Sequence, residues 1–221
     1  MASDLTIIVA DDHPLFRGAL KQAVGGLDQK PEIIEAEDLS SVRAAVATNP
    51  ESDVLLLDLA MPGMSGLAGL MALRAEFPAL PIVIVSASDD QSTMRRAFEL
   101  GVAGFISKST GIDDIRSAVQ TVLDGGVAEP EDFEPGRDQD PEIEDLLQRL
   151  QTLTPQQTRV LGMLSEGLLN KQIAYELGVS EATIKAHVSA VLLKLNVDSR
   201  TQAVIQLSKI SQTPMPDAMT Q

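Results

Sequence analysis

The stretch that decides the fold is VLLLDLAMP, which runs from Val54 to Pro62. Four apolar residues in a row, rather than at every second position, are typical of a parallel strand that is buried on both faces. The run ends in an aspartate, Asp58, and a loop with a proline follows it. The sequence therefore predicts a central strand with a carboxylate at its carboxyl end.

Four further short apolar runs lie on either side of this strand in the sequence: Thr6–Ala10, Glu32–Ala36, Pro81–Val85 and Gly104–Ile106. Segments of helical length separate the runs: Pro14–Val24, Leu39–Ala47, Gly66–Glu76, Ser92–Leu100 and Ile112–Leu123. Strands that alternate with helices in this way build a doubly wound α/β fold. We expect a five-stranded parallel sheet of the flavodoxin-like kind over residues 1–125.

The last third of the chain shows helical periods only, with helices expected at Pro155–Glu166, Lys171–Leu177, Glu181–Leu195 and Arg200–Lys209. The second and third are separated by the turn GVS, in which Ser180 is placed to cap the third helix. Two short helices joined by a three-residue turn that contains glycine are typical of a helix-turn-helix. We expect a small all-α four-helix domain over residues 150–211 and a flexible tail over 212–221.

Residues 126–149 form the expected linker. Its first part is rich in Gly, Pro and acidic residues and predicts a loop or tether. A short helix is then expected to begin at Pro141, with Asp140 as its cap. This helix carries apolar residues at helical spacing, namely Ile143, Leu146, Leu147 and Leu150. Its acidic character indicates either a solvated face or a helix that docks on the second domain, and both remain open.

Length and composition limit the alternatives. The 221 residues suit two ordinary domains, and 44% hydrophobic residues supply apolar material for packed cores. The absence of cysteine excludes a disulfide scaffold, a thiolate metal site and a cysteine nucleophile. No apolar run approaches the ~20 residues that a membrane span needs, and no basic segment precedes the first apolar run as in a signal peptide. We therefore expect a cytoplasmic protein with no membrane partner.

The charge is distributed unevenly along the chain, whose net charge is −15. Residues 1–125 hold 9 Lys/Arg against 18 Asp/Glu, and residues 126–150 hold 2 against 9. Residues 151–221 hold 6 against 5. A strongly acidic chain repels nucleic acid in bulk, so only the last third is suited to approach a phosphate backbone.

Polar side chains cluster at the carboxyl ends of the predicted strands, the edge at which functional groups collect in such sheets. They are Asp11, Asp12, Asp58, Ser86 and Lys108. Three carboxylates in proximity are costly without a counter-ion, and Mg²⁺ with its preference for oxygen ligands relieves that cost. A metal beside a carboxylate can stabilise a phosphoryl group transferred to an Asp oxygen. Taken singly, the same residues are helix caps, a turn serine and a surface lysine.

The stretches VADDHPLFR (Val9–Arg17), LLLDLAMP (Leu55–Pro62) and GFISK (Gly104–Lys108) resemble the receiver domain of response regulators. The resemblance implies that Asp58 accepts a phosphoryl group from the phosphohistidine of a sensor histidine kinase. It also implies a Mg²⁺ site made by Asp11, Asp12, Asp58 and the backbone carbonyl of Ala60, with Lys108 as the lysine of the motif. Ser86 and Phe105 match the switch residues; the strand position of Phe105 by itself indicates core packing, and its switch role rests on the resemblance. His13 is expected as a helix-start or kinase-contact residue rather than a metal ligand.

The outward face of the third helix of the second domain carries Lys185 among small residues, chiefly Ala186 and Ser189, which suits close approach to a DNA major groove. The residues placed to meet phosphates are Lys171, Thr183, Lys194 and Arg200. An ordinary solvent-exposed face is the alternative. The stretches LTPQQTRVL (Leu153–Leu161) and LGVSEATIKAHV (Leu177–Val188) resemble the LuxR-type helix-turn-helix. In relatives, positions matching Lys185, Ala186 and Ser189 reach base edges, and His187 has either a structural or a phosphate-contact role.

The two resemblances together are those of a NarL/FixJ-type response regulator, which is not an enzyme in the turnover sense. They imply double-stranded promoter DNA as a partner, a homodimer formed on phosphorylation, and RNA polymerase as a further candidate partner. Three other functions are compatible with parts of this sequence: a phosphorylation-independent DNA-binding protein with a vestigial receiver, an Asp-nucleophile phosphatase, and a quorum-sensing receptor. The phosphatase class needs an acid two residues after its nucleophile, where this chain has Ala60. Zero Trp and one Tyr leave little for an aromatic acyl-lactone pocket.

Overall fold

The computed structural model of the chain describes residues 5–136 and 141–211. Its described part contains one sheet of five parallel strands in the order β2-β1-β3-β4-β5. The strands are β1 (Thr6–Ala10), β2 (Glu32–Ala36), β3 (Val54–Asp58), β4 (Ile82–Ser86) and β5 (Gly104–Ser107). The strand VLLLD is thus central and buried at every position, as the unbroken apolar run predicts.

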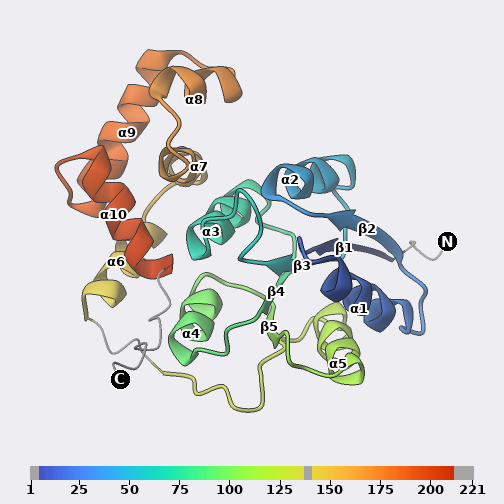
Figure 1. Cartoon of the computed structure of the whole chain (residues 1–221). Coiled ribbons are helices and arrows are strands. Elements are labelled where there is room, and N and C mark those ends of the chain that lie inside the picture. The colour runs from blue at the N-terminus through green and yellow to red at the C-terminus, as the bar shows by residue number, and fades with distance from the viewer. Residues whose placement is uncertain (1–4, 137–140, 212–221) are drawn as a thin grey trace, which may run out of the picture.

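Helices cover both faces of the sheet (Figure 1). One face packs against α1 (Pro14–Gly25) and α5 (Ile112–Leu123), and the other against α2 (Leu39–Thr48), α3 (Leu67–Glu76) and α4 (Gln91–Glu99). Successive residues of a strand point to opposite faces. Ile7 and Val9 accordingly enter the core under α1 and α5, whereas Ile8 and Ala10 enter the core under α2, α3 and α4. The fold is the doubly wound α/β sheet that the alternation predicts.

Local sequence explains where the helices begin. Asp38 accepts a hydrogen bond from the Ser41 N–H at 2.6 Å and caps α2, and the carboxylate of Asp90 accepts one from the Thr93 N–H at 2.8 Å and caps α4. Hydrogen bonds from Ser41 hold the pKa of the Asp38 carboxyl below its usual range. Burial by itself raises the pKa of the Asp90 carboxyl, but hydrogen bonds from Ser92 and Thr93 outweigh burial and lower that pKa. The strand and helix ranges expected from the sequence agree with the structure to within two residues at each end.

The second domain is helical throughout its described part. It contains α7 (Pro155–Ser165), α8 (Asn170–Glu176), α9 (Glu181–Leu195) and α10 (Arg200–Ser211), and the linker helix α6 (Pro141–Gln151) precedes it. The Ser180 hydroxyl accepts a hydrogen bond from the Thr183 N–H at 3.1 Å, so the cap expected for the third helix of the helix-turn-helix is present. No described helix has both the length and the apolar character needed to cross a membrane.

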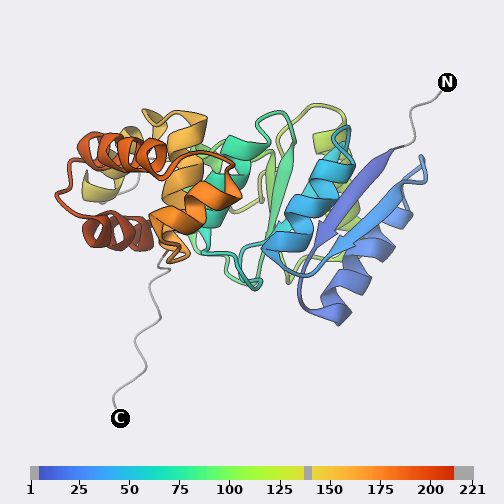
Figure 2. The same ribbon diagram turned by 90° about the horizontal axis from the view of Figure 1, so that it is seen from above.

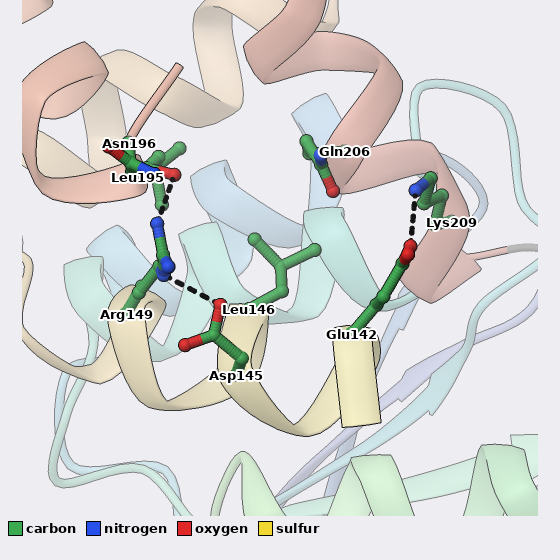
Figure 3. A pocket seen from close by; sticks show the side chains of 8 residues that line it. All are labelled: Glu142, Asp145, Leu146, Arg149, Leu195, Asn196, Gln206 and Lys209. Carbon is green, nitrogen blue, oxygen red and sulfur yellow. Dashed lines mark hydrogen bonds and ion pairs between the residues drawn. The ribbon is translucent and has the colours of Figure 1, made fainter. Parts of the chain in front are cut away.

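The linker helix α6 docks on the second domain. Its apolar residues, including Leu146 and Leu150, are buried. Arg149 Nη1 donates to the Leu195 carbonyl at 3.2 Å, and Lys209 pairs with Glu142 at 3.1 Å across a polar cavity of about 350 Å³ (Figure 3). Of the two possibilities left open by the sequence, docking on the second domain applies to the apolar face of α6. The acidic residues of α6 lie at the surface. The expected cap Asp140 and the expected tail over residues 212–221 lie outside the described residues.

The two domains are packed together through α3 and α7 (Figures 1 and 2). The helices approach closely, because a Cβ atom added at Gly162 of α7 would lie 2.9 Å from the Cβ of Ala72 on α3. At the edge of this contact, Glu76 pairs with Arg43 at 3.1 Å and with Arg159 of the second domain at 3.4 Å. The receiver-like domain and the helical domain thus share an apolar seam with charged groups at its rim.

Glu166 at this rim provides a test of the packing. Burial raises the pKa of the Glu166 carboxyl; Arg43 at 3.8 Å partly opposes the rise, and Glu76 adds to it. A carboxyl with a raised pKa favours the packed state below its ordinary pKa, and this contribution is lost as the pH rises through the raised value. We therefore expect Glu166→Gln to raise the Tm near neutral pH by about 2 °C and to give no gain near pH ~4, measured by thermal unfolding.

The matched control is Glu176→Gln, which changes an exposed carboxylate on α8 and should leave the Tm unaltered. A gain for Glu166→Gln that grows on acidification would contradict the assignment of an unfavourable buried charge at this rim.

Candidate functional site

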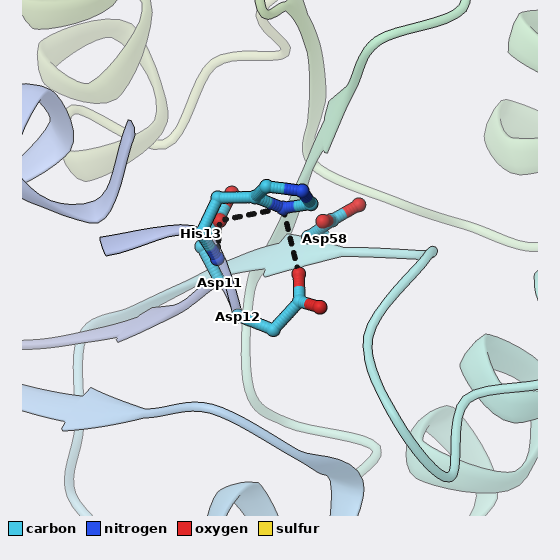
Figure 4. A group of neighbouring side chains, drawn as sticks. All are labelled: Asp11, Asp12, His13 and Asp58. Carbon is cyan, nitrogen blue, oxygen red and sulfur yellow. Dashed lines mark hydrogen bonds and ion pairs between the residues drawn. The ribbon is translucent and has the colours of Figure 1, made fainter. Parts of the chain in front are cut away.

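Three carboxylates meet at the carboxyl edge of the sheet. Asp58 ends β3 and is 2% exposed, and Asp11 follows the neighbouring strand β1 and is fully buried. Asp12 comes next, with its side chain 30% exposed. One ligand atom from each of these residues and from His13 lies within 4.8 Å of the others (Figure 4). The adjacency of β1 and β3 therefore places together residues that are 46 or 47 positions apart in the sequence.

Lys108 supplies the counter-charge. Its backbone N–H donates to the Ser86 carbonyl at 2.7 Å, which continues the β4–β5 pairing beyond the strand. Its Nζ lies 2.7 Å from Asp11 Oδ2 and 2.8 Å from Asp58 Oδ2. Burial by itself lowers the pKa of Lys108, but its bonds to Asp11 and Asp58 outweigh burial and raise that pKa above its usual value. The ammonium is therefore fixed in its charged form between the two buried carboxylates.

Two further residues of α1 support this arrangement, and neither was singled out from the sequence. The Phe16 ring lies under Lys108, with Nζ 5.0 Å from the ring centroid, a cation–π contact. Arg17 Nη1 donates to the Asp11 carbonyl at 2.6 Å, while its Nε pairs with Glu35 at 3.0 Å. Their position one helical turn after the acidic pair was the signal that could have identified them.

The remaining expected site residues surround the same edge. Asp58 Oδ1 accepts a hydrogen bond from the Ala60 N–H at 2.9 Å, which fixes the loop that carries the Ala60 carbonyl. Ser86 ends β4, one residue beyond Val85, the register partner of Asp58. Its hydroxyl accepts a hydrogen bond from the Ser88 N–H at 3.1 Å. Phe105 on β5 is 2% exposed and packs in the core beside α4, so its ring is an inward-facing core side chain here.

The donor set suits a hard divalent cation. Three carboxylates against one ammonium leave an excess of negative charge at a largely buried edge, and carboxylate oxygens are the ligands that Mg²⁺ prefers. Asp12 Oδ1 is buried and accepts no hydrogen bond from the described residues. His13 Nδ1 lies 2.8 Å from that oxygen, and the His13 N–H donates to Asp11 Oδ1 at 2.7 Å. The exposed His13 therefore lies at the start of α1, beside both acids.

The expected DNA-contact residues lie mainly on α9. Lys185, Ala186 and Ser189 are exposed on its outward face in the packed chain, so the first domain does not cover them. Lys185 pairs with Glu181 at 3.1 Å on the same helix. Thr183 is exposed and shares a hydrogen bond with the Ser180 hydroxyl, and His187 is half-buried. Lys171 is exposed on α8.

Two of the residues expected to contact phosphates donate hydrogen bonds within the domain. Lys194 Nζ donates to the Thr152 carbonyl at 2.7 Å and to Gln157 Oε1 at 2.8 Å. Arg200 Nη2 donates to the Leu168 carbonyl at 2.5 Å. In this arrangement both side chains tie the helices of the domain to one another, and Lys171 and Lys185 remain the basic groups on the exposed side.

Comparison with known proteins agrees with this two-part organisation. The family model described as the response regulator receiver domain matches residues 7–120. The model described as bacterial regulatory proteins of the luxR family matches residues 151–207. Each match falls on one of the two folds and includes its candidate site residues up to Lys108 and Lys194.

Individual relatives match over nearly the whole chain. The glycerol metabolism activator of Pseudomonas putida is 41% identical over 213 residues, which cover 94% of this chain and 96% of that protein. The nitrate/nitrite response regulator NarP of Escherichia coli strain K12 is 35% identical over 215 residues, which cover 92% and 94%. A solved complex of the two-component response regulator RcsB with DNA shares the fold, with a TM-score of 0.54, 23% identity and coverage of 93% and 98%. The chain therefore belongs to the NarL-type response regulators, in which a receiver domain is joined to a LuxR-type DNA-binding domain.

Proposed function

We propose that this response regulator accepts a phosphoryl group on Asp58 from a sensor histidine kinase and then binds promoter DNA as a dimer to regulate transcription. The observation that carries the proposal is the position of Lys108 Nζ, within 2.8 Å of oxygens of both Asp11 and Asp58 at the carboxyl edge of the sheet. A carboxylate held beside an ammonium and two further acids is equipped to receive a phosphoryl group with a metal ion.

The transfer replaces the N–P bond of the kinase phosphohistidine with an O–P bond to Asp58. An oxygen of Asp58 bonds to phosphorus as the N–P bond of the kinase phosphohistidine breaks, and the leaving imidazole keeps the bonding electron pair. Lys108 neutralises the charge on one phosphoryl oxygen. The Ser86 hydroxyl at the end of β4 is placed to donate a hydrogen bond to a second phosphoryl oxygen. Mg²⁺ held by Asp11, Asp12, Asp58 and the Ala60 carbonyl would supply charge neutralisation for the incoming group.

Phosphorylation alters the contacts that fix Asp58 and Lys108. In the unphosphorylated structure, Asp58 Oδ2 accepts a hydrogen bond from Lys108 Nζ, and Asp58 Oδ1 accepts one from the Ala60 N–H. Once one oxygen carries a phosphoryl group, Lys108 follows the new negative charge and Ser86 gains an acceptor. These new interactions would displace the ends of β4 and β5, because Ser86 is the last residue of β4 and Lys108 directly follows β5.

The DNA-binding part of the proposal rests on the exposed face of α9. The small residues Ala186 and Ser189 flank Lys185 and leave room for a major groove. The domain carries almost no net positive charge, so one copy has few phosphate contacts to offer. A symmetric dimer doubles those contacts and matches palindromic half-sites. Solved structures of RcsB dimers bound to DNA support pairing in a protein of the same fold.

The first experiment combines mass spectrometry with sedimentation. Incubation with acetyl phosphate and Mg²⁺ should add the mass of one phosphoryl group, and Asp58→Asn should abolish the addition because the amide is not a phosphoryl acceptor. The phosphorylated protein should sediment as a dimer at concentrations at which it binds DNA. A mass increment that persists in Asp58→Asn, or an unchanged monomer with full DNA affinity, would overturn the proposal.

The second experiment separates base contacts from phosphate contacts on a DNA site selected in vitro. Lys185→Ala should weaken binding to the selected site by roughly 1–3 kcal/mol and affect random DNA less. Lys171→Ala should weaken both alike and lower the slope of log K against log salt by about one phosphate contact.

Lys30→Ala, an exposed charge change in the receiver domain, is the control and should leave both affinities unchanged. Equal losses of Lys185→Ala on selected and random DNA would remove Lys185 from the base-reading residues.

A further inference from the structure

The segment of residues 127–134, called the strap below, is seated on the free edge of the sheet rather than hanging as a tether (Figure 1). The Phe105 N–H donates to the Ala128 carbonyl at 3.0 Å, and the Ala128 N–H donates to the Ala103 carbonyl at 2.9 Å. Ala128 thus forms a parallel β-bridge with Gly104 on the edge strand β5. The acidic, glycine- and proline-rich composition predicted a loop or tether, and it did not reveal this pairing.

The sheet edge is shaped to receive the strap. A Cβ atom added at Gly104 would lie 2.9 Å from the Cβ and 3.1 Å from the carbonyl oxygen of Ala128. The backbone of Gly104 lies outside the left-handed region, so its conformation does not require glycine. The absence of a side chain at this position is therefore explained by the close approach of the strap.

Helix α4 holds the other end of the strap. Gln91 Nε2 donates to the Asp132 carbonyl at 2.8 Å, and Gln91 Oε1 accepts from the Glu134 N–H at 3.0 Å. Phe133 packs on Phe98 of α4 with a ring-centroid distance of 4.7 Å. The amide of Gln91, the aromatic pair and a 3.5 Å hydrogen bond from Arg95 Nη1 to the Glu134 carbonyl thus fasten the strap to α4.

These anchors are joined to the phosphorylation edge by local hydrogen bonds between residues two apart in the sequence. The Ser88 N–H donates to the Ser86 hydroxyl at 3.1 Å, and the Asp90 N–H donates to the Ser88 hydroxyl at 3.4 Å. Asp90 caps α4, whose first residue is Gln91. On the other anchor, the N–H that holds Ala128 belongs to Phe105, on the strand that leads to Lys108.

The same helix also contacts the DNA-binding domain. Arg96 of α4 is 7% exposed, and its Nη1 donates to the carbonyls of Lys209 and Ile210 in α10 at 3.4 and 3.2 Å. Helix α4 therefore contacts both the strap and the domain to which the linker leads.

Ala128 is buried in the core under α5, but the residues that follow it in the strap border an open groove. This groove of about 620 Å³ separates part of the strap from α5, lined by acids of both segments, among them Asp114, Glu129 and Glu131. Like charges across an open groove do not stabilise the seat. The strap is thus held by the burial of Ala128 and by its contacts with β5 and α4.

We propose that the strap relays the state of Asp58 to the DNA-binding domain: seated on β5 and α4 it keeps that domain packed on α3, and phosphorylation unseats it. The proposal rests on the proposed phosphorylation of Asp58. The relay uses displacement of β5 and α4, the two elements that anchor the strap. Strand β5 ends one residue before Lys108, and α4 begins five residues after Ser86.

Gly104→Ala is the direct test, because the new methyl group occupies the place of Ala128 without touching the acidic site. Two readouts are made on the full chain. Hydrogen exchange reports the Ala128 and Glu134 amides. Energy transfer between dyes on Asp28→Cys and Glu176→Cys, both exposed positions in a chain without native cysteine, reports the distance between the domains.

Without any phosphoryl donor, Gly104→Ala should raise exchange at both amides at least tenfold and lower the energy transfer. Gly18→Ala is the matched control, because an added Cβ there meets no atom within 4 Å, and it should change neither readout. Gln91→Ala removes the clamp on α4 from a half-buried position and should act in the same direction; it decides the matter if Gly104→Ala does not fold. Acetyl phosphate with Mg²⁺ should produce both changes in the parent.

Fast strap exchange with unchanged energy transfer in Gly104→Ala would overturn the relay. So would a parent that gains the phosphoryl mass while its strap amides stay protected. The variant arm needs no phosphoryl group, so its failure is distinct from a failure of Asp58 phosphorylation.

Discussion

The ammonium of Lys108, held between the buried carboxylates of Asp11 and Asp58, is the interaction on which the rest of the structure depends. Two buried acids at neighbouring strand ends would repel each other without it. The β4–β5 pairing fixes the backbone of Lys108, and Phe16 supports its Nζ from α1. The ammonium therefore joins the ends of β1 and β3 to β5 and α1.

The packing of the two domains limits how such a change can act on DNA binding. The outward face of α9 is exposed although the domains are packed, so release of the receiver is not needed to uncover Lys185. What the packing does occupy is α10, through α3 and through Arg96 of α4. The regulation proposed for this chain therefore acts on the freedom and pairing of the DNA-binding domain, since its recognition helix is already exposed.

Much of this organisation could be predicted from the sequence, because strand ends and helix faces follow from period and spacing. The meeting of Asp11, Asp12, Asp58 and Lys108 follows from the rule that functional groups gather at the carboxyl edge of a parallel sheet. The seat of residues 127–134 could not be predicted, since backbone pairing with Gly104 leaves no apolar pattern. The internal bonds of Lys194 and Arg200 were hidden for a similar reason: a basic residue on a helix surface looks the same whether it meets a phosphate or a carbonyl.

The central claim is that Lys108 balances a cluster of acids built to receive a divalent cation and a phosphoryl group. Thermal unfolding of the parent chain and of Lys108→Ala, with and without Mg²⁺, tests it most directly. Removal of the ammonium should lower the Tm without Mg²⁺. Mg²⁺ should raise the Tm of both proteins, because a ligand that binds only the folded site stabilises it. The rise should be larger for Lys108→Ala, because its carboxylates lack the competing ammonium. A Tm that Mg²⁺ leaves unchanged in both proteins would contradict the account.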